Sequence, residues 1–487
     1  AFYLSSDKRL LKSTGKLFEL IISDLEIKDA SQMLHIGDNW NTDILKARSC
    51  GIKAYFVPKA TDTFGNWVSR LKTNDCISIY AKPQGFLANY TYAMQQLPIR
   101  CMLGVIANRY FDNPFYYSFY KNSNYNGDPY FMGLYLLGML AFGFTKKIAD
   151  DACLQGYEKL HFLSRDGYLF KQVYDMLALY YKNPPPSDYV YVSRKALLPY
   201  QIKTAYNFYD ICNHMDIIQH TPQDILEMYA AVLKPLTQED ERTYRDNGIL
   251  LNQNFKTMGD FVCFINVMLN ISYDDTKRQD STQSLQEYMK SIFGKHDATV
   301  DLGYSGKLQS ILCDLAEVPI NAYFLYSNGY NTSYVAKKSG YHFSSYYDFL
   351  PSGSVSVRES LIIENGPSCI GYQKTATGIE PVFEENRMGY IEKYVYGELH
   401  RGVLDFTQEI LTHFSDKLDM FELRGAELAA PFENFLCHAT DFDRAVFSCC
   451  YMEDEVYAGL SRISLSEIWA QDMVTQGFWK QNESPVV

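Results

Sequence analysis

The sequence has no C-x-x-C motif, no long run of basic residues and no uninterrupted apolar segment long enough to cross a membrane. Its 11 cysteines are scattered, and the adjacent pair Cys449 and Cys450 lacks the neighbouring His or Cys of a zinc site, so we expect free thiols in a reducing cytoplasm. Lys and Arg total 45 against 57 Asp and Glu, a net charge of −12. A protein that binds nucleic acid needs a basic stripe, so we expect no nucleic-acid partner.

The most apolar stretch, residues 130–144, is shorter than the roughly 20 residues of a membrane span and contains three glycines. It therefore predicts a buried helix, with Lys146 and Lys147 at its C-terminal end. The first residues, Ala1 and Phe2, are not followed by a basic and then apolar signal, so we expect the chain to begin inside a domain.

Aromatic residues are abundant, at 15% of the 487 residues, and a chain of this length predicts several domains. Alternation of apolar runs with amphipathic segments predicts an α/β fold. The expected divisions are four: 1–62, the C-terminal portion of an α/β core; 63–129, a linker and helical segment with the domain junction near 62–86; 130–380, a second α/β domain with a helical insertion at 203–296; and 381–487, a mainly helical region.

An acidic loop follows the first predicted strand, residues 34–36. Gly37 allows a close turn, Asp38 stands at the carboxyl end of the strand, and Asp43 lies in the first turn of a helix predicted over 41–50. A second strand is predicted over 52–57. Two carboxylates at such an edge suit Mg²⁺, although a turn residue and a helix N-terminal acid would look the same.

The order Lys12-x-x-Gly15-x-Leu17-Phe18, then the Gly37-Asp38 loop, then Gly51-Ile52 before a strand resembles the haloacid dehalogenase superfamily of hydrolases. The resemblance implies a Rossmann-like core, a phosphoryl-stabilising role for Lys12, and acids at Asp38 and Asp43 that hold or orient Mg²⁺. The family's Asp-x-Asp nucleophile motif has no match in this segment. We therefore expect it to precede Ala1, and the chain alone to be nearly inactive as a phosphatase.

Three further motifs each stand at the end of an apolar strand. They are Ser164-Arg165-Asp166-Gly167 with the strand at 159–164, Ser193-Arg194-Lys195 with the strand at 189–192, and Asp301-Leu302-Gly303-Tyr304-Ser305-Gly306 with the strand at 298–302. With their surroundings, residues 136–373, they resemble the long region fused to such hydrolase cores in bacterial proteins linked to surface-polysaccharide synthesis. If the strands are parallel neighbours, their loops converge and form one binding site. The predicted site residues are Arg165, Asp166, Ser193, Arg194, Asp301, Gly303, Ser305 and Gly306.

The chemistry of this second set suits an anion. Two arginines can clamp a phosphate, and the N–H groups of Gly303 to Gly306 at the start of a helix over 307–316 can bind one. Alternatively, Arg165 pairs with an acid as a structural ion pair and the glycines only make a turn. Glu359 is a weaker candidate for the same pocket.

The sequence thus favours a Mg²⁺-dependent phosphohydrolase of the haloacid dehalogenase type, fused to a module that binds a phosphorylated small molecule such as a sugar phosphate or nucleotide-sugar. Two alternatives stay open. The second region is itself a glycosyl- or phosphoribosyl-type transferase, or the chain is a noncatalytic binding scaffold.

Overall fold

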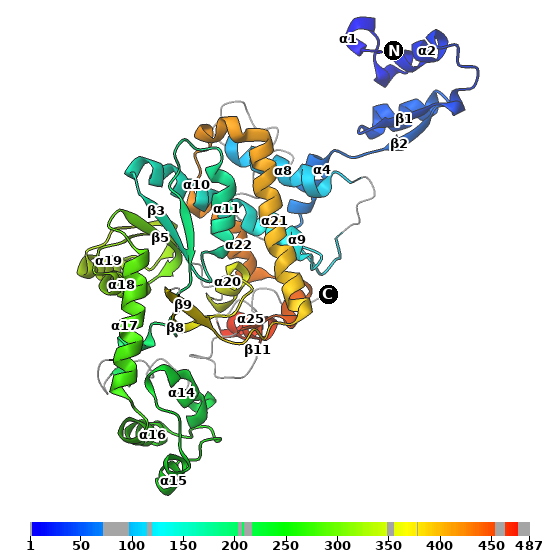
Figure 1. Ribbon diagram of the computed structural model, residues 1–487. Coiled ribbons are helices and arrows are strands. Elements are labelled where there is room, and N and C mark those ends of the chain that lie inside the picture. The colour runs from blue at the N-terminus through cyan, green and yellow to red at the C-terminus, as the bar shows by residue number, and fades with distance from the viewer. Residues whose placement is uncertain are drawn as a thin grey trace. The chain divides into compact units, whose positions relative to one another are not determined.

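The computed structural model describes residues 2–71, 97–113, 119–202, 207–208, 217–347, 355–376, 378–452 and 463–475 (Figure 1). The chain forms two compact units, Ala1–Lys121 and Asn122–Val487. Their boundary falls inside the segment predicted as a linker, residues 63–129. Residues 72–86 of the predicted junction lie outside the described part of the chain.

The N-terminal unit contains the predicted β–α–β arrangement. Strands β1 (Leu34–Gly37) and β2 (Lys53–Phe56) pair in parallel, and the chain between them forms η3 (Trp40–Leu45) and α3 (Lys46–Ser49). Phe18, Ala47 and Ile52 form a small core beneath the strands. The segments before β1 are α1 (Ser5–Lys8), η1 (Lys12–Thr14), α2 (Lys16–Asp24) and η2 (Ala30–Gln32).

An aromatic cluster joins the next two helices of this unit, α4 (Ala60–Val68) and α8 (Leu97–Phe111). Phe64 packs against Trp67 and Phe111, with ring centroids 5.6 and 5.3 Å away. Because α4 spans residues 60 to 68, the domain boundary expected at residue 62 lies inside this helix.

The C-terminal unit is built on a parallel five-stranded sheet of order β4-β3-β5-β6-β7. Its mixed α/β character was predicted, as were four of the strands. The fifth, β7, was not. The strands are β3 (Lys159–Leu163), β4 (Ser187–Val190), β5 (Asp297–Tyr304), β6 (Asn321–Ser327) and β7 (Phe343–Tyr347).

Helices cover both faces of this sheet. On one face, Tyr323 of β6 donates a hydrogen bond to Asp151 of α10 (Gly138–Gln155), and Phe162 of β3 packs against Tyr174 of α11 (Tyr168–Ala178). On the other face, Leu163 and Phe324 share a core with α17 (Asp275–Ile292) and α18 (Lys307–Ala316). The helix α18 has the bounds that the sequence predicts.

The apolar segment after residue 128 is a core helix. It runs through α9 (Pro129–Met132), η4 (Gly133–Leu137) and α10, and it is the one described helix long and apolar enough to cross a membrane, yet 94% of its most apolar window is buried. The expectation that Lys146 and Lys147 end this helix is wrong. Lys146 pairs with Asp150 one turn later, at 2.7 Å, and Lys147 donates to the Ser345 carbonyl, so both charges are satisfied inside the helix.

The predicted insertion is helical where it is described, and it has its own apolar core around Tyr244 and Phe264. Residues 203–206 and 209–216 lie outside the described residues. The remaining elements of this part are α12 (Leu198–Gln201), η5 (Ile217–Gln219), α14 (Pro222–Met228), η6 (Ala230–Val232), α15 (Gln238–Asp246) and α16 (Met258–Ile271).

The C-terminal part combines a hairpin with long helices. Its elements are α19 (Tyr330–Ser339), α20 (Val355–Ile362), β8 (Cys369–Thr375), β9 (Gly378–Phe383), α21 (Tyr390–Phe414), η7 (Ser415–Met420), α22 (Gly425–His438), α23 (Asp441–Ala445), η8 (Val446–Cys449), β10 (Tyr451–Met452), β11 (Ile463–Ser464) and α25 (Leu465–Thr475).

A buried carboxylate holds the first loop of the C-terminal unit. Asp443 accepts hydrogen bonds from the Ser123 hydroxyl at 2.6 Å and from the backbone N–H groups of Asn124, Tyr125 and Gly127 at 2.8 to 3.1 Å. Residues 320 positions apart in the chain are thereby fixed to one another.

We expect Asp443→Ala to lower the free energy of unfolding of this unit by about 3 kcal/mol, because several buried donors lose their acceptor. The exposed Asp416→Ala is the matched control and should change stability little. Urea denaturation of both variants checks this, and equal effects would contradict the anchoring role of Asp443.

Candidate functional site

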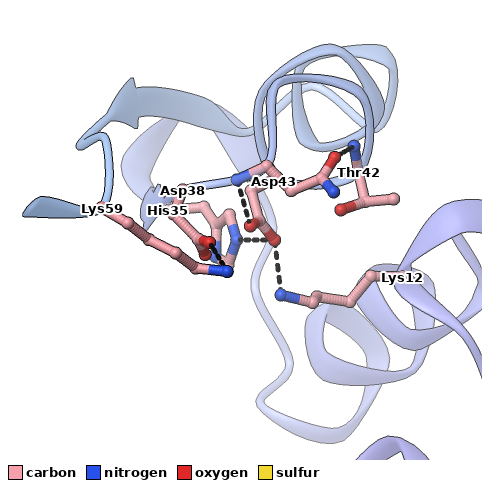
Figure 2. Close-up of polar contacts among 7 residues, drawn as sticks. Lys12, His35, Asp38, Thr42, Asp43 and Lys59 are labelled. Carbon is pink, nitrogen blue, oxygen red and sulfur yellow. Dashed lines mark hydrogen bonds and ion pairs between the residues drawn. The ribbon is translucent and has the colours of Figure 1, made fainter. Parts of the chain in front are cut away.

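The carboxylate of Asp43 is the centre of the polar contacts in the N-terminal unit (Figure 2). It is 2% exposed. Its Oδ1 atom accepts hydrogen bonds from Lys12 Nζ and from His35 Nε2, the latter at 3.1 Å, and its Oδ2 atom accepts one from the backbone N–H of Asn39 at 3.1 Å. Residues from η1, β1 and η3 thus meet at one acid.

The local sequence explains why Asp43 reaches this position. Asn39 caps the turn by accepting a hydrogen bond from the Thr42 N–H at 3.0 Å, which starts the helical segment directly after the strand. A Cβ atom on Gly37 would lie 2.5 Å from the Asp43 side chain. Glycine at position 37 therefore leaves the space that the carboxylate occupies.

Asp43 is held as an anion. Burial raises its pKa, but the hydrogen bonds from Lys12, His35 and Asn39 outweigh burial and lower the pKa to about 2. At neutral pH a buried negative charge therefore fixes the ammonium group of Lys12 at the carboxyl end of β1.

Asp38 lies next to this network and is more open, at 43% exposed. Its Oδ2 atom pairs with Lys59 Nζ at 3.0 Å, and this hydrogen bond lowers the pKa of Asp38. The negative charge of Asp43 acts on it in the opposite direction, which indicates that the two carboxyls are near one another. Of the three predicted residues, Lys12 and Asp43 therefore pair with each other, whereas Asp38 pairs with Lys59.

Asp38 is better suited than Asp43 to bind a Mg²⁺ ion. Mg²⁺ binds proteins through one or two carboxylates and keeps several waters. Asp38 has one oxygen engaged by an exposed lysine, whereas both oxygens of Asp43 already accept hydrogen bonds. No group of three or more His, Cys, Asp or Glu side chains suited to a metal occurs among the described residues. The metal-ligand role of both acids stays a prediction.

We expect Asp43→Asn to destabilise the segment 34–57 by about 2 kcal/mol at pH 7, the equivalent of the shift in pKa from 3.8 to about 2. Because the folded pKa is the lower one, this stabilisation is present above pH 4 and is lost as the pH falls toward 2. Hydrogen exchange of that segment at several pH values measures it, with exposed Asp7→Asn as the control. If Asp43→Asn destabilises the segment as much at pH 2 as at pH 7, the stabilisation does not come from the ionised carboxylate of Asp43.

A second candidate site lies at the carboxyl edge of the five-stranded sheet. β3 and β5 are neighbours, paired through Phe162 and Val300, and the chain order of the strands reverses between them. Ligands of open α/β sheets bind at such a reversal. Asp166 follows β3, and Asp301 lies near the end of β5, 6% exposed.

The two acids lie within hydrogen-bonding range of one another. Burial, and then the neighbouring Asp166, raise the pKa of Asp301 well above its usual range, and Glu359 adds to the rise. Burial also raises the pKa of Asp166, while the charges of Arg165 and Arg194 oppose that rise. Burial and the neighbouring carboxyl therefore disfavour the charged form of Asp301.

The charges of Arg165 and Arg194 thus act on Asp166, which in turn acts on Asp301, and the binding role of these four residues stays a prediction. Arg165 also donates to the Gly366 carbonyl at 3.3 Å.

Ser193 has a structural role, because its hydroxyl donates to the Cys369 carbonyl at 2.5 Å and accepts from the Ala196 N–H.

The glycine loop is shaped by its packing. Gly303 has a φ of 101°, and a Cβ there would lie 2.4 Å from the Tyr326 carbonyl oxygen of β6. Gly306 also has a positive φ, 71°, at the N-cap of α18. Ser305 lies between them and is half-buried, and its hydroxyl makes no hydrogen bond within the described part of the chain. Both positions therefore favour glycine, and the binding of an anion by their N–H groups stays a prediction.

Several contacts were not foreseen. His35 and Lys59 contact the acids of the first site, and Tyr304 and Arg358 lie near the second. The only signal for His35 was its position two residues before Gly37, on the strand that carries the loop. Comparison with known proteins adds no relative: no protein-family model matches the chain, and no curated protein matches its sequence.

Proposed function

We propose that the N-terminal unit handles a phosphoryl group with the help of Mg²⁺, as part of a phosphohydrolase core of the haloacid dehalogenase type. The observation that supports the proposal is the buried, ionised Asp43, which fixes Lys12 at the carboxyl end of the parallel strand that Asp38 follows. A phosphate bound there would have a cation from Lys12 on one side and the metal-binding carboxylate of Asp38 on the other.

Each residue then has a distinct task. Lys12 neutralises charge on the phosphoryl oxygens, Asp43 positions Lys12, and Asp38 binds the metal. Mg²⁺, when bound, would supply further neutralisation of phosphate charge. The resemblance supplies no attacking carboxylate within the matching segment, so binding of the metal is the property to measure first.

We further propose that the C-terminal unit binds a phosphorylated small molecule, a sugar phosphate or a nucleotide-sugar, at the carboxyl edge of its sheet. The position between β3 and β5 and the charges of Arg165 and Arg194 support this. A link to bacterial surface-polysaccharide synthesis is part of the same proposal and rests on the sequence resemblance alone.

The alternative that this unit is a glycosyl- or phosphoribosyl-type transferase is favoured by one specific observation. A buried carboxyl with a raised pKa, next to a second carboxyl, is an arrangement found at sites of proton transfer.

The ion pair with Lys59 gives the metal site a testable property. Removing the competing cation should free Asp38, and an exposed pair of this kind is worth about 0.5 kcal/mol. We therefore expect Lys59→Met to increase the affinity for Mg²⁺ by about twofold, and Asp38→Asn to abolish specific binding.

Titration calorimetry with MgCl₂ at constant ionic strength measures both effects. Asp7→Asn, which removes an exposed acid of the same unit, is the control and should bind as the unchanged chain does. If Asp38→Asn binds Mg²⁺ with undiminished affinity, Asp38 is not the metal ligand and the proposal fails.

A further inference from the structure

The imidazole ring of His35 is oriented by the same carboxylate that holds Lys12. Its Nε2 atom lies 3.1 Å from Oδ1 of Asp43, the oxygen atom that also accepts a hydrogen bond from Lys12 Nζ (Figure 2). Because Asp43 forms an ion pair with the ammonium group, it is a carboxylate, which can only accept hydrogen bonds. Nε2 of His35 is therefore the nitrogen that carries the proton, and in the neutral ring Nδ1 holds a lone pair.

A second contact fixes the same ring from the core. His35 lies edge-to-face against Phe18 of α2, with ring centroids 5.0 Å apart and an interplanar angle of 75°. Phe18 is 2% exposed and belongs to the small core beneath β1 and β2. One polar and one aromatic contact thus hold the imidazole in a single orientation.

The Nδ1 atom of His35 is open to solvent. No hydrogen bond to it occurs among the residues that the structure describes, and the side chain is 25% exposed. It is not a buried atom without a partner, in contrast to Nδ1 of His161 in the C-terminal unit. His35 therefore presents a lone pair that a bound molecule can reach.

The ammonium group of Lys12 is a neighbour of this ring, because Lys12 and His35 donate to one and the same oxygen atom. A phosphoryl group that contacts Lys12 consequently comes close to His35. Lys12 would neutralise charge on the phosphoryl oxygens. Asp43 would stabilise the positive charge that the ring acquires when Nδ1 forms a bond.

Both acids of this site are already engaged. Asp43 accepts hydrogen bonds at its two carboxylate oxygens, and Asp38 pairs with Lys59. A histidine whose ring is oriented by a third group is one of the side chains that form covalent intermediates in catalysis. The arrangement of His35 and Asp43 has this form.

We propose that His35 is a catalytic residue of the N-terminal unit and that its Nδ1 atom accepts a phosphoryl group from an acyl phosphate, with Asp43 as the positioning residue. An acyl phosphate suits the site because its leaving group departs as a carboxylate and needs no proton. The inference rests on the proposed function for the phosphoryl group at Lys12. It goes further by naming an attacking group within this chain, where the sequence resemblance placed one before Ala1.

The step balances without another reactant. The Nδ1 lone pair forms a bond to phosphorus, and the bond from phosphorus to the acyl oxygen breaks. That oxygen keeps the electron pair and leaves as a carboxylate, while the ring keeps its Nε2 proton and becomes positive beside Asp43. Water then forms a bond to phosphorus, the nitrogen–phosphorus bond returns its electron pair to Nδ1, and the proton that water loses passes to solvent.

The first test uses the full chain with acetyl phosphate as the phosphoryl donor. We expect one phosphoryl group on His35, located by mass spectrometry of peptides and identified by ³¹P NMR as an acid-labile, alkali-stable phosphohistidine. His35→Gln keeps an N–H donor for Asp43 but has no nucleophilic nitrogen, so it should not be phosphorylated at this position. A chain that is never phosphorylated at His35, or equal total phosphorylation of His35→Gln, would overturn the proposal.

His413 provides a matched control. Its Nε2 atom also faces a carboxylate, that of Glu409 at 3.4 Å, but the pair lies within one helix and the histidine is 53% exposed. We expect no phosphorylation of His413, and His413→Gln should be phosphorylated at His35 as the unchanged chain is. If His413 and His35 are phosphorylated at equal rates, the reaction is that of any accessible histidine and the catalytic role of His35 is wrong.

The role of the neighbours is measured by the rate of phosphorylation. We expect Asp43→Asn and Lys12→Met each to slow the modification of His35 about tenfold, the low end of what a hydrogen bond to a charged group contributes. Lys12 is 39% exposed, so Lys12→Met keeps the test decisive if Asp43→Asn does not fold. An unchanged rate in Lys12→Met would show that the phosphoryl group does not contact Lys12, and the proposal would fail.

The failure of this inference and the failure of the proposed function are distinguishable. If Asp38 binds Mg²⁺ but His35 is never phosphorylated, the inference is wrong and the metal site stands. If His35 is phosphorylated while Asp38→Asn binds Mg²⁺ with undiminished affinity, the metal-binding role of Asp38 is wrong and the inference stands.

Discussion

The N-terminal site depends on one interaction, the contact between the buried carboxylate of Asp43 and the ammonium group of Lys12. The desolvation of Asp43 is offset by three hydrogen-bond donors, so the acid stays ionised and the lysine stays charged beside it. Gly37 is part of the same constraint, because any side chain there would displace the carboxylate. Asp43, and not Asp38, pairs with Lys12, so the metal-binding role proposed for Asp38 does not compete with that ion pair.

The C-terminal unit rests on a different constraint, the order of its parallel strands. Because β5 follows a long helical insertion and still pairs with β3, residues 135 positions apart, such as Asp166 and Asp301, meet at one edge of the sheet. Helices on both faces bury the strands, and α20 adds Arg358 and Glu359 from outside the sheet. The site thus combines a scaffold of local strands with polar groups that only the tertiary fold brings together.

The sequence was informative where signals are local. Apolar runs that end in Gly or in charged residues located β3, β5 and β6, and the bounds of α18 were predicted because Gly306 precedes its first turn. Prediction failed where contacts between residues far apart in the sequence determine the local structure. β7 contains two serines and is held by pairing with β6, and the charge of Lys147 inside α10 is satisfied by β7. For the same reason the resemblance named Lys12, Asp38 and Asp43 but not the way in which they pair.

The central claim, that Lys12 and Asp38 lie on opposite sides of one metal-bound phosphate, is tested most directly by a crystal structure of the chain grown with Mn²⁺ and tungstate as substitutes for Mg²⁺ and phosphate. The account predicts anomalous scattering from Mn²⁺ at the Asp38 carboxylate and from tungstate within hydrogen-bonding distance of Lys12 Nζ. Ions bound elsewhere, with the pair of Asp38 and Lys59 intact, would contradict it.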